Sequence, residues 1–149
     1  MRPTVSVIVP AHNAQGTIER ALSSAWEQTR RPDEIVVADD GSTDGTAVLA
    51  ERAGAQVLRL PKGNGAIGRN RAVDAAAGDL LLFLDADDAW EPGKVAAHLD
   101  AWSRDPGSFV FDFATRLRPD GVSDGYLGQG PEGSVSWDAF LEWTTWTTG

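Results

Sequence analysis

The sequence contains no cysteine, and this absence excludes several kinds of chemistry. Without a thiol the chain can form no disulfide, no zinc–thiolate site and no cysteine nucleophile. Long hydrophobic runs are also missing, because no stretch approaches the roughly 20 apolar residues of a membrane span. The first residues lead directly into a predicted strand, so we expect no signal peptide. These absences favour a cytoplasmic protein and leave open a peripheral association with the inner face of the membrane.

Basic residues are scarce relative to acidic ones. The chain has 13 Lys and Arg against 22 Asp and Glu, which gives a net charge of -9. A general nucleic-acid binder normally presents a basic face, so we expect no nucleic-acid partner. The 149 residues, 42% of them hydrophobic, are enough for one domain with a sizeable core. An acidic balance suits a site that recruits a metal ion.

Short apolar segments alternate with helical patterns over the first two thirds of the chain. The expected strands are residues 5–9, with Pro10 as their end, then 34–39, 56–60 and 79–84. The expected helices are residues 17–28, 46–53, 65–77 and 92–103. This alternation predicts an α/β fold with a mainly parallel sheet and helices on both faces. Sheets of this kind bind ligands at the carboxyl ends of their strands.

The pattern changes after the last of these helices. Residues 109–113 alternate with period two, which predicts a strand with one wetter face and a late antiparallel addition to the fold. Residues 124–134 are rich in glycine and are expected to form a mobile loop. Residues 137–146 favour a short amphipathic helix with three tryptophans, whose apolar stripe would favour self-association if it lacked cover.

The run from Asp79 to Asp88 is the most informative stretch. Its unbroken apolar part predicts a strand buried on both faces. Asp85 and Asp87 follow it two residues apart, so in an extended chain they point to the same side. Such a pair can hold a hard divalent cation against a phosphate. The alternative is a solvated loop that simply ends the strand with acids.

Polar or acidic clusters follow three of the predicted strands, at residues 10–13, 39–44 and 85–88. The carboxyl ends of parallel strands lie along one edge of a sheet, so these clusters are expected to meet. Acids gathered there repel each other unless a cation or hydrogen-bond donors compensate. The clusters therefore predict a site for a metal and a phosphate without naming the reaction.

Four of these segments together carry a family resemblance. Residues 5–13, 39–46, 68–70 and 83–88 occur in this order and resemble the nucleotide-binding half of the family-2 glycosyltransferases, which have the Rossmann-like GT-A fold. The resemblance covers about residues 5–102. It implies an inverting enzyme that transfers a sugar from a nucleotide-diphosphate donor, usually a UDP-sugar. The acceptor would be a saccharide, a lipid or another hydroxyl compound.

The resemblance assigns the base-binding side of the site. It implies that Asp39 accepts a hydrogen bond from the base, and a carboxylate suits the N–H of uracil because it only accepts. The loop of Pro10, Ala11, His12 and Asn13 would wrap the base. His12 stands where the family often has an aromatic residue, so it is expected to stack on the base, although a loop histidine can also be merely solvated.

The resemblance also assigns the diphosphate side. Arg69 matches an arginine that reaches the nucleotide, while a structural ion pair with Asp85 or Asp39 is the alternative. The run Asp85-Ala86-Asp87 matches the family's DXD motif. It implies that Asp85 lies near the ribose and that Asp87, with Asp85, holds the Mg²⁺ or Mn²⁺ that bridges the phosphates. Asp88 is expected to support this site or to cap a helix.

One departure from the family concerns the carboxylate base that deprotonates the acceptor. In the family that base lies well beyond the DXD strand, and neither Asp138 nor Glu142 matches its motif, so the catalytic residue stays unknown. We expect a truncated single GT-A domain, with residues 1–103 as the nucleotide-binding core and 104–149 as the start of the acceptor side. Of the acids after the second strand, Asp40 or Asp44 is expected to cap the next helix.

Other functions remain open at this point. A nucleotidyltransferase shares a related fold, but it would carry a basic, glycine-rich loop where residues 10–13 stand. A haloacid-dehalogenase-like phosphatase needs an Asp-x-Asp-x-Thr/Val run after its first strand, and the chain has none there. A nucleotide-sugar-binding module without turnover is the non-enzymatic alternative.

Overall fold

The computed structural model describes residues 2–63, 65–104, 106, 109–110, 114–117, 123–127 and 134–135. The chain divides into two compact units, Met1–Ala96 and Ala97–Gly149. Each unit is described by itself.

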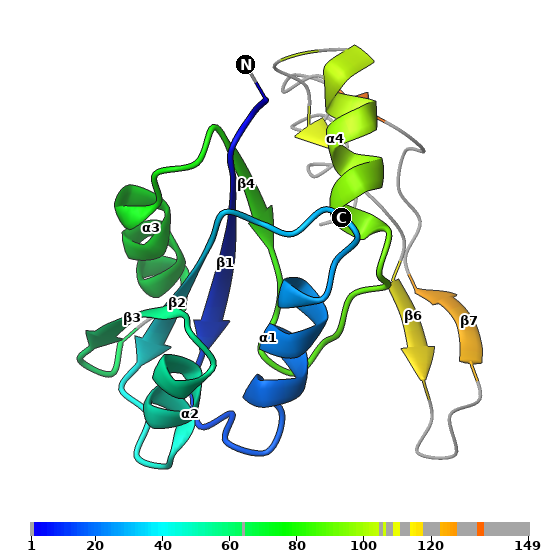
Figure 1. Ribbon diagram of the computed structural model, residues 1–149. Helices are drawn as coiled ribbons and strands as arrows, with labels where there is room; N and C mark the ends of the chain where they lie inside the picture. The colour runs from blue at the N-terminus through cyan, green and yellow to red at the C-terminus, as the bar shows by residue number, and fades with distance from the viewer. Residues whose placement is uncertain are drawn as a thin grey trace, which may run out of the picture. The chain divides into compact units, whose positions relative to one another are not determined.

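The first unit is built on a parallel sheet of four strands in the order β3-β2-β1-β4 (Figure 1). The strands are β1 (Val5–Ala11), β2 (Glu34–Asp40), β3 (Gln56–Leu60) and β4 (Leu80–Phe83). Strand β1 is central, because Ile8 stands in register with Val36 of β2 and with Phe83 of β4. All pairings are parallel, which confirms the predicted α/β class.

Helices cover both faces of this sheet. They are α1 (Ile18–Trp26), α2 (Thr46–Arg52) and α3 (Gly65–Ala75), and α4 (Lys94–Arg104) follows β4. One core cluster joins α1 to the sheet through Leu22, Val7 and Val37, and a second joins α3 to the opposite face through Ala72, Ile8 and Val36. The two clusters use alternate residues of β1 and β2, as the period of two in a strand requires.

The prediction that Pro10 ends the first strand is wrong. Strand β1 continues to Ala11, and Pro10 stands in register with Ala38 of β2. The N–H and C=O of one strand residue point to the same side, and the carbonyl of Ile8 accepts from Leu84 on the β4 side. Pro10 therefore faces the side where the pairing with β4 has ended, and its missing N–H costs no ladder bond.

The prediction that the central strand is buried on both faces is also wrong. Leu82 and Leu84 are buried, whereas Leu81 is 37% and Phe83 is 49% exposed. Within the described sheet β4 is an edge strand, and α3 packs on β1, β2 and β3 rather than over it. The apolar run does form a strand, but among the described residues no helix packs over the face of β4 that carries Leu81 and Phe83.

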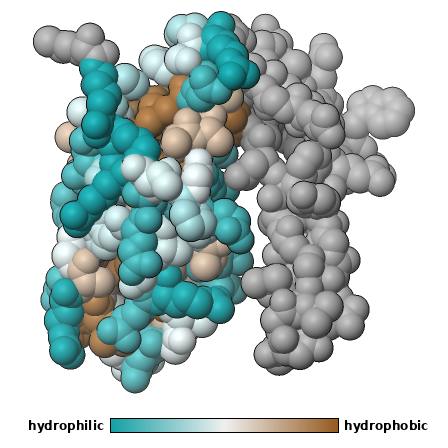
Figure 2. Space-filling view, turned by 45° about the vertical axis from the view of Figure 1, so that its right-hand side comes forward, coloured by the Kyte–Doolittle hydropathy of each residue, from teal (hydrophilic) through white to brown (hydrophobic). Residues whose placement is uncertain are grey.

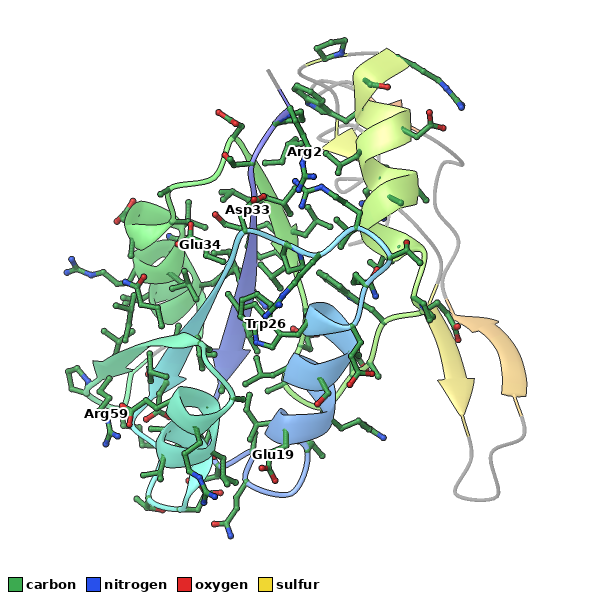
Figure 3. The ribbon with its side chains drawn as sticks, in the orientation of Figure 1. Arg2, Glu19, Trp26, Asp33, Glu34 and Arg59 are labelled. Carbon is green, nitrogen blue, oxygen red and sulfur yellow. The ribbon has the colours of Figure 1, made fainter. Side chains whose placement is uncertain are left out.

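At the amino ends of the strands, acidic side chains accept hydrogen bonds from the backbone of the segment that leads into β1. Asp79 accepts the N–H and the hydroxyl of Thr4, both at 2.8 Å. Asp33 accepts the N–H of Val5 at 2.8 Å and pairs with Arg30 at 3.0 Å. In Figure 3 Asp33 and Glu34 lie at the end of the sheet where β1 begins.

A second set of bonds at the same end surrounds Ser6, which is completely buried. Its hydroxyl donates to Glu34 and accepts the N–H of Gly78 at 2.8 Å, and Glu34 also accepts the N–H of Ala77. A Cβ atom on Gly78 would lie 2.4 Å from the Ser6 hydroxyl and 2.7 Å from its backbone nitrogen. Only glycine fits this close approach of the chain to β1.

The described part of the second unit contains two antiparallel strand pairs. Strand β5 (Phe109–Val110) pairs with β8 (Ser134–Val135), and β6 (Ala114–Leu117) pairs with β7 (Ser123–Leu127). These pairs confirm the late antiparallel addition. The loop predicted from residue 124 is wrong over β7, because pairing with β6 satisfies backbone groups there despite the glycine. The rest of that loop between the strands, residues 111–113 and the helix predicted at 137–146 lie outside the described residues.

The surface of the described residues is mainly hydrophilic on the face that Figure 2 shows. In the view of Figure 2 hydrophilic residues cover most of the coloured face, with small hydrophobic patches between them. No helix among the described residues is both long and apolar enough to cross a membrane.

Candidate functional site

A cavity of about 330 Å³ lies at the carboxyl ends of β1 and β4, where the loop before α1 faces the turn after β4. Its lining residues come from these two segments and from the residue that precedes α1: Pro10, His12, Asn13, Ala14, Thr17, Asp85, Ala86 and Asp87. The acids and the histidine loop therefore share one space, as the parallel sheet predicted.

Six of the nine predicted nucleotide-binding residues line this cavity, and three do not. Ala11 is buried in β1, directly in register with Asp39 at the end of β2. Arg69 lies on α3 and reaches the site through its guanidinium, which is 3.6 Å from a carboxylate oxygen of Asp85. All nine positions thus belong to one edge of the sheet, but Asp39 and Arg69 lie beside the cavity rather than in its lining.

The acidic segment after β4 is a turn and not an extended chain. The carbonyl of Asp85 accepts the N–H of Asp88 at 3.0 Å. The expectation that Asp85 and Asp87 share one side of an extended strand is therefore wrong in its geometry, because β4 ends at Phe83. Both residues are exposed and still line the same cavity, since the turn folds them toward it.

The pKa of Asp88 is raised by its surroundings at this turn. Partial loss of hydration raises the pKa of its carboxyl above the ordinary value of 3.8, and the charges of Asp87 and Asp85 raise it further. Arg20 and Lys94 oppose this rise to a smaller degree. The neighbouring cations therefore do not fully offset the negative charge around Asp88, although Arg69 forms an exposed ion pair with Asp85, and a further cation would be favoured at this turn.

Asp39 is the most enclosed acid of this edge, with 4% of its surface exposed. Its Oδ1 accepts the N–H of Ser42 at 3.2 Å. Within the described residues this is the one hydrogen bond that the side chain of Asp39 makes. The second carboxylate oxygen has no hydrogen-bond partner within the described residues and can accept from a donor on a ligand. This arrangement suits the one imide N–H of a uracil ring.

Hydrogen bonds hold the loop after β1 against the loop after β2. The carbonyl of Asp40 lies 2.8 Å from Nδ1 of His12, and since a carbonyl only accepts, Nδ1 carries the proton. Asn13, at a positive φ of 49°, accepts the N–H of Thr43 at 2.9 Å and donates its own N–H to the hydroxyl of Ser42 at 2.8 Å. Asn13 thus lines the cavity and also fixes the loop.

The two acids expected as caps have different partners. Asp44 accepts the backbone N–H of Thr46, the first residue of α2, at 3.0 Å, and so satisfies a donor at the start of this helix although Gly45 occupies the N-cap position itself. The hydroxyl of Thr46 also donates to Asp44, and this bond is the main cause that lowers the pKa of the carboxyl. Asp40 instead accepts the N–H of Gly63 at 2.9 Å, in the loop before α3.

Three residues near the acids were not predicted from the sequence. Ala14 and Thr17 line the cavity, and the guanidinium of Arg20 donates to the carbonyl of Asp87. A signal for them exists, because the helix after the first strand of a parallel sheet begins at the carboxyl edge. Polar side chains in its first turn, such as Thr17 and Arg20, therefore face the same site as the strand ends.

The residues present fit a divalent cation that binds together with a phosphate ligand. Asp85 and Asp87 supply carboxylate oxygens, the donors that Mg²⁺ and Mn²⁺ prefer. Within the described residues no group of three or more His, Cys, Asp or Glu side chains could hold a metal by itself. Mg²⁺ commonly binds through one or two carboxylates with substrate phosphates completing its shell, and this donor set suits that mode.

Comparison with known proteins places these features in a family. The sequence pattern of Glycosyl transferase family 2 matches residues 6–129. The "Putative teichuronic acid biosynthesis glycosyltransferase TuaG" of Bacillus subtilis is 32% identical over 147 residues, which are 95% of this chain and 58% of TuaG. The chain thus spans little more than half the length of this relative.

Solved structures of glycosyltransferases share the fold. S. aureus TarS 1–349 in complex with UDP has a TM-score of 0.61 and 30% identity, over 68% of this chain and 32% of that one. The mannosyltransferase PcManGT from Pyrobaculum calidifontis, in complex with GDP-Man and Mn²⁺, has a TM-score of 0.66 and 31% identity. It covers 78% of this chain, which spans 36% of PcManGT. These neighbours confirm the predicted GT-A architecture.

Proposed function

Because the chain belongs to glycosyltransferase family 2, we propose that it forms the donor-binding part of an inverting enzyme that transfers a sugar from UDP to a hydroxyl acceptor. The acceptor would be a saccharide, a lipid or another hydroxyl compound, and a divalent metal would assist the reaction. The chain spans 58% of TuaG, so the activity of the whole protein is part of this proposal.

The observation that carries the proposal is the shared cavity of the histidine loop and the acidic turn. His12 and Asn13 lie at one side of it, and Asp85 and Asp87 at the other. A nucleotide diphosphate has the same two parts, a flat base and a doubly charged diphosphate. A site with aromatic and amide groups at one end and metal-binding acids at the other matches that ligand in chemistry and order.

Each side chain then has a distinct task. The open oxygen of Asp39 accepts the imide N–H of uracil, and His12 offers its ring to the face of the base. Asp85 and Asp87 would hold Mg²⁺ or Mn²⁺, which would offset the charge that develops on the departing diphosphate. Arg69 is free to change partner, since its pair with Asp85 is largely exposed and therefore weak.

The hydrogen bond that Ser42 already makes to one oxygen of Asp39 favours a base with a single donor, such as uracil, over guanine. Guanine presents two neighbouring donors, N1–H and the N2 amino group, which a carboxylate binds best with both oxygens free. One oxygen of Asp39 is already engaged by Ser42. The neighbouring structures hold UDP in TarS and GDP-Man in PcManGT, so the fold admits both bases and the choice must be made locally.

Isothermal titration calorimetry tests the proposal directly. We expect UDP to bind in the presence of Mn²⁺, to bind much more weakly with EDTA, and to bind better than GDP under the same conditions. Equal affinity for UDP with and without EDTA would remove the metal from the site. A preference for GDP over UDP would contradict the assignment of the base, and absence of binding to both would contradict the donor site.

A further inference from the structure

Asp40 links three loops at the carboxyl edge of the sheet. It is the last residue of β2, its backbone carbonyl accepts from Nδ1 of His12, and its carboxylate accepts the N–H of Gly63. His12 belongs to the loop before α1, and Gly63 belongs to the loop before α3. One residue therefore holds the loop on either side of its own strand.

The backbone next to Asp40 brings the third loop into direct contact. Gly41 has a φ of +66°, a conformation that favours glycine, and a Cβ atom at this position would lie 2.6 Å from the backbone nitrogen of Lys62. The chain after β2 and the chain before α3 thus touch through their backbones. The bond between Asp40 and Gly63 fixes the register of this contact.

The contact with the carbonyl also sets the proton distribution of His12. With Nδ1–H donated to Asp40, Nε2 keeps its lone pair and lies 3.3 Å from the side-chain nitrogen of Asn13. Asn13 is in turn held by Thr43, so the ring is restrained at both nitrogens. These contacts limit the rotation of a ring that lines the cavity.

We propose that Asp40 is a positioning residue that shapes the base-binding side of the site and so sets its base selectivity. This inference rests on the proposed function, because it requires that a nucleotide occupies the cavity. Asp40 itself is not among the residues that line the cavity. Its backbone carbonyl positions His12, which does line the cavity, and its carboxylate holds Gly63 in the loop that leads into the helix that carries Arg69.

The test compares the affinities for UDP and CDP, each with Mn²⁺, because these ligands share the diphosphate and differ only in the base. Asp40→Ala removes the acceptor of Gly63 and releases that loop, which must then be ordered again when UDP binds, so we expect UDP binding to weaken roughly fivefold to tenfold. The affinity for CDP should change less, so the preference for UDP narrows. Asp40→Asn keeps a side-chain oxygen for Gly63 and is expected to restore most of the preference.

The control is Asp74→Ala, the same chemical change at an exposed position of α3. It should leave both affinities unchanged. Nitrogen NMR of the imidazole of His12 supplies a second readout, and we expect the Nδ1–H tautomer of the neutral ring in the parent chain. Thermal unfolding of each variant confirms that folded protein is compared.

The outcomes separate this inference from the proposed function. If the parent chain binds neither ligand, the proposed function fails. If the parent prefers UDP and folded Asp40→Ala keeps the same preference, or loses affinity for UDP and CDP equally, the positioning role is wrong. A folded Asp40→Asn that fails to restore the preference, or a neutral His12 protonated at Nε2, would also overturn it.

Discussion

The acids at the amino end of the four-stranded sheet and the acids of the turn after β4, at its carboxyl end, have different surroundings. At the amino end the backbone N–H of Val5, together with Arg30, lowers the pKa of Asp33. The backbone N–H and hydroxyl of Thr4 lower that of Asp79. These carboxylates are ordinary structural acceptors that hold strands and loops together.

At the carboxyl end the pKa of Asp88 is raised instead, by partial loss of hydration and by the neighbouring acids. Asp85 and Asp87 line a cavity beside it. The same residue type therefore has hydrogen-bond donors around it at the amino end, whereas in the turn after β4 it lies mainly among other acids, with one exposed ion pair from Arg69 to Asp85. Thus the hydrogen-bond donors around a carboxylate, and not the residue type, distinguish a structural acid from an acid of a ligand-binding site.

Among the changes proposed here, removal of a carboxylate that would bind the metal should have the largest effect on UDP binding. We expect Asp87→Ala to weaken UDP binding in Mn²⁺ about 100-fold, or about 2.7 kcal/mol, because the ion loses one of its two protein carboxylates. Calorimetry measures the change, and Asp74→Ala serves as the matched control. Thermal stability should not fall, since a repelling charge is removed. Unaltered binding by Asp87→Ala would exclude this residue from the metal site.

A larger side chain at the amino end of the sheet should lower the stability of the fold and leave UDP binding unchanged. We expect Gly78→Ala to lower the free energy of unfolding by about 2.5 kcal/mol, because the new methyl would overlap Ser6 of β1. Urea unfolding measures this, and Gly93→Ala is the control, since a Cβ atom at Gly93 would meet nothing within 4 Å. The folded variant should bind UDP as the parent does. If Gly78→Ala is as stable as the parent, the backbone near Ser6 can shift to accommodate a methyl group, and the close contact at Gly78 does not require glycine.

Loss of the proposed contact between Asp39 and the base should weaken UDP binding somewhat less than loss of a metal-binding carboxylate. We expect Asp39→Ala to weaken UDP binding by about 2 kcal/mol, the order of a hydrogen bond to a charged group. Asp39→Asn should lose less, because its side-chain oxygen can still accept. Calorimetry of both variants, checked for folding by circular dichroism, decides the question. If folded Asp39→Ala binds UDP like the parent, the base contact is assigned to the wrong residue.

Acid titration should give the smallest effects, with opposite signs at the two ends. The lowered pKa of Asp79 means that its stabilising contribution is present above the ordinary value of 3.8 and is lost as pH falls through the lowered value. The raised pKa of Asp88 means that its ionised form opposes folding above the raised value, and that this cost disappears as pH falls toward 3.8.

We therefore expect Asp79→Asn to lower the melting temperature at pH 7 and Asp88→Asn to raise it. Both differences should fade in acid: that of Asp88→Asn between its raised pKa and 3.8, and that of Asp79→Asn below 3.8. Differential scanning calorimetry across this range measures both. Shifts of the same sign at pH 7 would remove the electrostatic distinction between the two ends.

Much of the sheet could be predicted because its strands are short apolar runs between turn residues. Strand β3 matches its expected bounds, and β2 differs by one residue. The exposure of Phe83 could not be predicted, because an apolar run shows that a strand forms and not which neighbours cover it. The extension of β1 through Pro10 depends on which edge β4 pairs with, and this is a tertiary fact.

The site could be predicted in its residue types but not in its connections. Parallel topology places the ends of β1, β2 and β4 together, so the sequence predicts that their polar clusters meet, and the family resemblance assigns His12, Asp39 and Asp85 within them. The turn that follows β4 and the bond from Gly63 to Asp40, 23 residues apart, leave no local sequence pattern. Contacts of this kind arise from packing between loops.

The most direct test of the account is where Mn²⁺ binds, seen by NMR of the backbone amides in the presence of UDP. A paramagnetic ion broadens nearby amides with a steep dependence on distance, and the seven residues of β1 separate the two ends by roughly 20 Å. We predict that Mn²⁺ with UDP broadens the amides of Ala86, Asp87 and Asn13 and leaves those of Val5 and Gly78 sharp. Broadening centred on Val5 and Gly78, or none at Ala86 and Asp87, would contradict the assignment of the carboxyl end as the donor site.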